Sequence, residues 1–147
     1  MAMNNGRIVL SGLAAGVIMN VFGYVGQVML LGKRMESEML AVAPTLQGKG
    51  MGSGAMAGRV LTSLVIGLLL AWLYAAMRPR FGAGMKTAVY AALVVWLCGF
   101  LFYLDWLYLE MMTPSTYAMT SFVMLVTLFI AAGVAGWLYR EPDGATM

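Results

Sequence analysis

A short hydrophilic stretch, residues 78–86, separates two long apolar runs near the middle of this chain. It contains three cations, one proline and two glycines. Proline and glycine interrupt helices, so the helix before it is predicted to end near Met77 and the next to begin near Thr87. Lys and Arg beside apolar spans are typical of cytoplasmic loops. The stretch therefore divides the chain into two helical hairpins and orients both of them.

The composition excludes an ordinary soluble domain. Of the 147 residues, 62% are hydrophobic and 10% are charged, whereas soluble domains have about 45–50% apolar and about 25% charged residues. Nine cations and six anions are too few to cover a soluble surface. We therefore expect an integral membrane protein with a single transmembrane domain over residues 1–147.

Four apolar runs are predicted to cross the membrane as helices: residues 8–31, 59–77, 87–107 and 115–139. A helix of about 20 apolar residues spans the hydrocarbon core. Residues 32–58 form the long outer loop, in which residues 33–43 are predicted to make a short helix that Pro44 ends. Thr113 and Pro114 are predicted to cap and open the last span. The expected fold is an all-α bundle of four antiparallel transmembrane helices.

The positions of the cations predict the orientation. An even number of spans places both termini on the side of residues 78–86, and that side carries Arg7, Arg78, Arg80, Lys86 and Arg140. The opposite side carries Lys33, Arg34, Lys49 and Arg59, spread over a longer loop. The rule that cations stay inside then predicts cytoplasmic termini in a bacterial inner membrane. Arg78, Arg80, Lys86 and Arg140 are expected to anchor helix ends at lipid headgroups, so the charge of +3 indicates lipid and not nucleic acid.

One face of the first span carries small and polar residues at helical spacing: Gly12, Gly16, Asn20, Gly23 and Gln27. The second span repeats small residues every fourth position, including Ser63 and Gly67. Such stripes let helix backbones approach closely, and amides can hydrogen-bond across the contact. The stripe is therefore a candidate packing or binding face. Asn20 and Gln27 are either adhesive residues between helices or the polar lining of a solute path.

Asp105 lies close to the predicted outer boundary of the membrane. If this carboxylate lies below the headgroups, it is expected to pair with a cation, and Arg59 is predicted to lie on the same side. Glu110 is the other candidate member of this group. One interpretation is an ion pair or a helix-end charge, and the other is a proton or cation site.

Few residues suit catalysis or cofactor binding. The chain has no histidine and a single cysteine, Cys98, and no nucleophile–base pair or phosphate loop is recognisable. Fifteen methionines raise the alternative of a Cu(I) site, but methionine also fills helix interfaces. We predict no enzymatic activity, no metal and no cofactor.

Residues 12–20 (GLAAGVIMN) and 72–88 (WLYAAMRPRFGAGMKTA) resemble small bacterial four-span membrane proteins of unassigned function. The resemblance covers less than half of the chain. It implies a helix bundle in the bacterial inner membrane and brings no substrate or catalytic residue with it.

The leading hypothesis is a non-enzymatic accessory or scaffolding subunit that associates with other transmembrane helices or with itself. The two small-residue stripes motivate it. The alternative is a small solute or ion transporter that uses Asn20, Gln27 and Asp105. Residues 71–74 (AWLY) and 136–139 (GWLY) are similar and are compatible with two hairpin repeats, although Trp and Tyr also recur at membrane interfaces.

Overall fold

The computed structural model describes residues 4–47 and 52–139, and within them it contains helices and no strand. Four helices are long and apolar enough to cross a membrane, which confirms the predicted all-α transmembrane fold. These spans are Asn5–Leu30, Ser53–Phe81, Met85–Tyr108 and Pro114–Leu138.

The first span has two parts, α1 (Asn5–Gly23) and a π-helical segment, η1 (Tyr24–Leu30). A short helix, α2 (Gly32–Val42), and a 3-10 turn, η2 (Pro44–Leu46), follow it, so the helix predicted to end at Pro44 is confirmed. The other three spans are single helices: α3 (Ser53–Phe81), α4 (Met85–Tyr108) and α5 (Pro114–Leu138).

The predicted cap of α5 is confirmed. The Thr113 side chain accepts a hydrogen bond from the Thr116 N–H, and Pro114 occupies the first helical turn. Proline suits this position because its missing N–H would have no intrahelical partner there. The turn between α4 and α5 thus opens the last span at a defined residue.

The predicted limits of the second span, residues 59–77, were wrong at both ends. Helix α3 begins six residues earlier, at Ser53, and passes through Pro79 to end at Phe81. In the last turn Pro79 removes only one backbone hydrogen bond, so the helix tolerates it. The two glycines of the turn end the helix instead: Gly82 has φ +85° and Gly84 has φ +128°, a conformation that glycine adopts readily.

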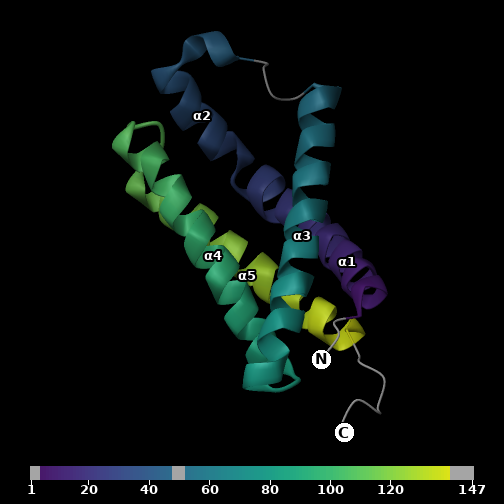
Figure 1. Cartoon of the computed structure of the whole chain (residues 1–147). Coiled ribbons are helices and arrows are strands. Elements are labelled where there is room, and N and C mark those ends of the chain that lie inside the picture. The colour runs from purple at the N-terminus through teal and green to yellow at the C-terminus, as the bar shows by residue number, and fades with distance from the viewer. Residues whose placement is uncertain (1–3, 48–51, 140–147) are drawn as a thin grey trace, which may run out of the picture.

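The helices pack in the order α3, α1, α5, α4. Helix α1 crosses α3 and lies along α5, and α4 packs along α5 (Figure 1). Helices α3 and α4 meet near their shared turn and diverge from there (Figure 1). The start of α1, the α3–α4 turn and the end of α5 lie at one end of the molecule, and α2 and the α4–α5 turn lie at the other. We call these the turn end and the α2 end.

Alanines fill the interior of the bundle. Nine of them are at most 1% exposed: Ala15, Ala71, Ala75, Ala88, Ala91, Ala92, Ala131, Ala132 and Ala135. Small side chains let helices approach closely in a membrane, where water does not drive helices together. Most of these alanines lie in the half of the bundle near the turn end, where all four spans converge.

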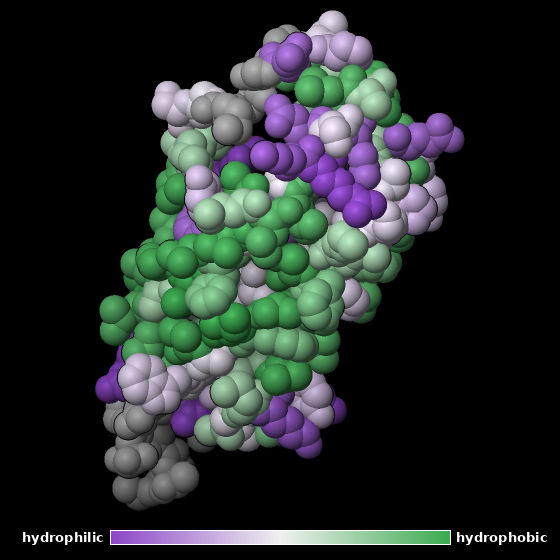
Figure 2. All heavy atoms as spheres, turned by 180° about the vertical axis from the view of Figure 1, so that it is seen from behind, coloured by the Kyte–Doolittle hydropathy of each residue, from purple (hydrophilic) through white to green (hydrophobic). Residues whose placement is uncertain are grey.

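The outer surface has the distribution expected of a membrane-spanning bundle. Figure 2 shows an apolar band across the middle of one face and hydrophilic residues toward both ends. The apolar band matches the hydrocarbon core, and the polar ends match the headgroup regions.

Candidate functional site

Helices α1 and α3 approach each other through their backbones. A Cβ added at Gly12 would lie 2.7 Å from the Leu68 Cα, and one added at Gly16 would lie 2.7 Å from the Leu64 Cα. A Cβ at Gly67 would overlap the Gly12 carbonyl oxygen and the Gly16 backbone nitrogen. These glycines let the two backbones touch, which is the geometry of small-residue packing.

Ser63 lies beside this contact on α3 and is half-buried. Its hydroxyl donates to the Arg59 carbonyl, one turn earlier in the same helix, at 3.0 Å. Its own carbonyl oxygen lies 3.0 Å from a Cβ built at Gly16. Ser63 therefore contributes its backbone to the contact with α1 and satisfies its side chain locally.

The two amides of the first span bond to different helices. Asn20 Nδ2 donates to the Gly16 carbonyl at 3.0 Å and, at 3.5 Å, to the Val60 carbonyl of α3. Gln27 Nε2 donates to the Thr120 carbonyl of α5 at 3.1 Å. A backbone carbonyl oxygen has two lone pairs, so it can accept one of these hydrogen bonds in addition to the bond within its own helix. The amides thus link the first span to α3 on one side and to α5 on the other.

Gly23 is an exception to the predicted packing face. A Cβ added there meets nothing within 4 Å, whereas one added at Gly26 would overlap Val123 of α5. Gly23 is the last residue of α1, and the π-helical segment begins directly after it, at Tyr24. Its wider turn changes which residues face a neighbouring helix, so an α-helical spacing no longer applies after Gly23.

Asp105 forms no ion pair with Arg59 in the part of the chain that the structure describes. Asp105, Glu110 and Arg59 are all exposed, and the ion pair found in residues 4–47 and 52–139 joins Arg34 to Glu38. Arg59 and Asp105 lie toward the α2 end, where α3 and α4 have diverged. Glu110 follows α4 with a φ of +54°.

The predicted headgroup anchors lie at the turn end. Arg80 and Lys86 are exposed, and the Lys86 ammonium lies 5.8 Å from the centre of the Tyr90 ring. Arg78 is half-buried, with its guanidinium carbon 5.7 Å from the centre of the Tyr139 ring. Lys49 and Arg140 lie outside the described residues.

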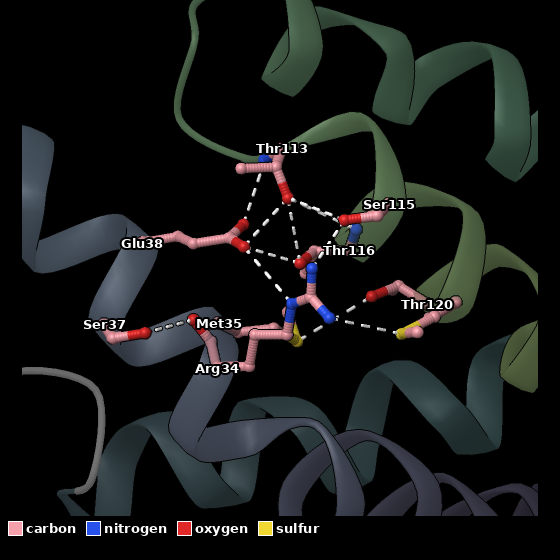
Figure 3. A network of polar contacts seen from close by, with 9 residues as sticks. Arg34, Met35, Ser37, Glu38, Thr113, Ser115, Thr116 and Thr120 are labelled. Carbon is pink, nitrogen blue, oxygen red and sulfur yellow. Dashed lines mark hydrogen bonds and ion pairs between the residues drawn. The ribbon is translucent and has the colours of Figure 1, made fainter.

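A polar cluster at the α2 end was not predicted. Glu38 of α2 reaches the first turn of α5 (Figure 3). One carboxylate oxygen accepts the Thr113 N–H at 2.9 Å, and the other accepts the Thr113 hydroxyl at 2.9 Å and the Thr116 hydroxyl at 2.6 Å. Arg34 lies 3.4 Å from Glu38 and also donates to Ser115. We call Arg34, Glu38, Thr113, Ser115 and Thr116 the α2–α5 latch.

The latch holds its carboxylate in the charged form. Burial of Glu38 favours the neutral acid, but hydrogen bonds from Thr116, Thr113 and Arg34 outweigh this and lower the pKa from 4.5 to about 2. The position at the N-terminus of α5 also suits a negative charge. Glu38 therefore fastens α2 to α5 and is not a proton donor near neutral pH.

The sequence contained part of the signal for this latch. Arg34 and Glu38 are one helical turn apart, and Thr113-Pro114-Ser115-Thr116 is a helix start rich in hydroxyls. Nothing in the sequence indicated that two segments separated by 75 residues meet. Among the described residues, no three His, Cys, Asp or Glu side chains gather as metal ligands.

The contacts just described fasten helices to one another. Comparisons of the chain with protein-family models, with curated proteins and with solved structures found no match. Its functional interpretation therefore depends on the geometry of its own residues.

Proposed function

We propose that this protein is a non-enzymatic accessory or scaffolding membrane subunit that packs against other transmembrane helices, in a larger complex or in a second copy. The small-residue stripes that first suggested this role are occupied within the chain by the contact of α1 with α3. The support now comes from α4. The apolar part of α4 is 22% buried within the chain, against 28% for the first span and for α3 and 33% for α5.

The outward side of α4 forms one continuous helical stripe, which we call the α4 outer stripe. Its exposed members recur at helical spacing, with separations of one, three or four residues: Val94, Leu97, Cys98, Leu101, Phe102, Asp105 and Leu109. The side chain of Phe102 is 80% exposed. Lipid tails can cover the apolar members, but they offer no hydrogen-bond or ion-pair partner to a carboxylate.

Asp105 is the observation that carries the proposal. It is an exposed carboxylate on an apolar stripe, without an ion-pair partner in residues 4–47 and 52–139. An ionisable residue of a transmembrane helix is costly where it lies below the headgroups, and there it normally faces a partner. A neighbouring helix with a lysine or arginine near the same depth satisfies this carboxylate and covers the apolar residues beside it.

Photo-crosslinking from Cys98 tests the α4 outer stripe. Cys98 is the chain's single cysteine and is exposed, so a maleimide-linked benzophenone labels one known position. In native membranes we expect a crosslinked product heavier than the monomer, containing a second copy or another membrane protein. The matched control combines Cys98→Ala with Leu69→Cys, an exposed position on α3.

The control is expected to give less crosslinked product than Cys98. Lipid adducts alone at both positions, together with a strictly monomeric mass after gentle detergent extraction, would contradict the proposal. Equal protein adducts at both positions would reject the assignment to α4 specifically.

A transport function along Asn20 and Gln27 has less support. The two amides donate to backbone carbonyls of α3 and α5, respectively, and do not face one another along a common path. Asp105 lies on the outward side of α4. Interhelical adhesion accounts for both amides without a solute.

We place the protein in the bacterial inner membrane with the turn end in the cytoplasm, on the basis of Arg78, Arg80 and Lys86. Alkaline phosphatase is active only after export. It should be inactive when fused after Lys86 and active when inserted after Met111 in the α4–α5 turn. The reverse pattern would invert the orientation.

A further inference from the structure

A pocket of about 320 Å³ opens at the turn end, between the last turns of α3 and α5 and the first turn of α4. This volume lies at the lower end of the usual range for ligand pockets, about 300–1,000 Å³. The pocket touches three helices that converge there, so its walls belong to the best-packed part of the bundle.

The pocket is lined by two kinds of groups. Its apolar wall consists of Met85, Ala88, Gly133 and Gly136. Its polar wall includes the half-buried guanidinium of Arg78 and the backbone at Gly84. A ligand that fits both walls has an anionic group joined directly to an apolar part.

Aromatic residues hold the shape of this pocket. The Tyr74 hydroxyl accepts a hydrogen bond from the Gly84 N–H at 3.2 Å, and the Tyr74 and Tyr139 rings meet edge to face with centres 6.0 Å apart. Both tyrosines are 2% exposed. Trp137 at the rim is 68% exposed, as is usual for tryptophan at the membrane interface. The pocket is thus built by packed residues at headgroup depth.

We propose that this pocket binds one anionic phospholipid, with its phosphate at Arg78 and the start of its acyl chains against Met85, Ala88 and Gly133. Arginine suits phosphate because its planar fork donates two parallel hydrogen bonds. The exposed Arg80 and Lys86 nearby raise the local concentration of anionic lipid. Basic pockets between transmembrane helices are a known setting for lipid headgroups.

Native mass spectrometry of the full chain with phosphatidylglycerol, and separately with phosphatidylcholine, tests the proposal. We expect one phosphatidylglycerol to remain bound under conditions that remove the others, and no such retention of phosphatidylcholine. Arg78→Gln is expected to weaken this binding about tenfold, because a charge-assisted contact is lost. The matched control is Arg80→Gln, which removes the same charge two residues away and outside the pocket, and should change binding less than about twofold.

A second variant covers the chance that Arg78→Gln unfolds. Gly133→Leu keeps every charge of the protein. A Cβ at position 133 lies 3.5 Å from the Met85 Cε, which is an ordinary contact distance. The rest of the leucine side chain is expected to fill the apolar part of the pocket. It is expected to remove the tightly held lipid while the thermal transition of the protein stays unchanged. Folded Gly133→Leu protein that retains phosphatidylglycerol would overturn the proposal.

Two further outcomes also count against it. If Arg78→Gln and Arg80→Gln weaken the binding of phosphatidylglycerol equally, the lipid is attracted by the positive charge of this region and is not held in the pocket. Inorganic phosphate that displaces the retained lipid at low millimolar concentration would indicate an anion site without selectivity for lipid.

Discussion

Replacing Gly67 with alanine is expected to destabilise the bundle by about 1–3 kcal/mol, the usual cost of overpacking, and replacing it with leucine is expected to prevent α1 and α3 from packing. The added Cβ overlaps the Gly12 carbonyl oxygen and the Gly16 backbone nitrogen. Backbone atoms in a helix cannot move aside as the end of a flexible side chain can, so the two helices must separate. Unfolding of the purified protein in increasing concentrations of denaturing detergent measures the effect.

The matched control is Gly58→Ala on the same helix, where an added Cβ meets nothing within 4 Å. Alanine favours a helix over glycine by about 1 kcal/mol, so this variant should be neutral or slightly more stable. The two substitutions therefore have opposite expected signs. Gly67→Ala with a stability equal to that of Gly58→Ala would mean that α1 and α3 do not approach as closely as described.

The same contact can be tested from α1, where Gly16 and Gly23 form a second matched pair. A Cβ at Gly16 would lie 2.7 Å from the Leu64 Cα, whereas one at Gly23 has open space. Only the Gly16 substitution should therefore destabilise the bundle. The sequence placed both glycines on one face, and only the structure distinguishes them.

Hydropathy and spacing predicted the parts of this fold that depend on local sequence. The four spans, the helix that ends before Pro44 and the start of α5 at Thr113 and Pro114 follow from apolar runs and capping residues. The end of α3 could not be predicted in this way. Hydropathy shows where the apolar residues end, whereas the helix continues for several residues beyond them. Pro79 lies inside the last turn, and the positive φ of Gly82 ends the helix.

Contacts between segments far apart in the chain could not be predicted from the sequence. The glycines of α1 indicated close packing but not its partner, and the π-helical turn after Gly23 altered the face that followed. Asp105 and Arg59 share one end of the molecule, yet the divergence of α3 and α4 prevents their pairing. Conversely, no local pattern around Glu38 indicates that its carboxylate accepts hydrogen bonds from Thr113 and Thr116 at the start of α5.

The second large effect is expected from Glu38→Gln, which should release α2 from α5. The substitution keeps the size of the side chain and removes the charge that accepts bonds from Thr113, Thr116 and Arg34. Hydrogen bonds to a charged group contribute about 1.5–3 kcal/mol. The loss of stabilising free energy should lie toward the lower end of this range, because the Arg34 side chain is 42% exposed and water screens its charge. Faster amide hydrogen exchange in α2, with the four spans still protected, measures the release.

Glu36→Gln is the control, since Glu36 lies two residues away on the same helix and is exposed. It removes the same charge outside the latch, so exchange in α2 should stay as in the unmodified protein. Equal acceleration in both variants would mean that net charge on α2, and not the bonds to α5, holds this helix in place.

Acid should reproduce the Glu38→Gln effect, because the pKa of Glu38 is lowered from 4.5 to about 2 in the folded protein. A carboxylate with a lowered pKa stabilises the folded state fully above its unfolded pKa. Its contribution is then lost as the pH falls from about 4.5 toward 2, when the unfolded chain binds the proton first. Protection of α2 should decline over this range in the unmodified protein. Glu38→Gln should lack this decline, whereas Glu36→Gln should retain it; a decline that persists in Glu38→Gln would place the responsible group elsewhere.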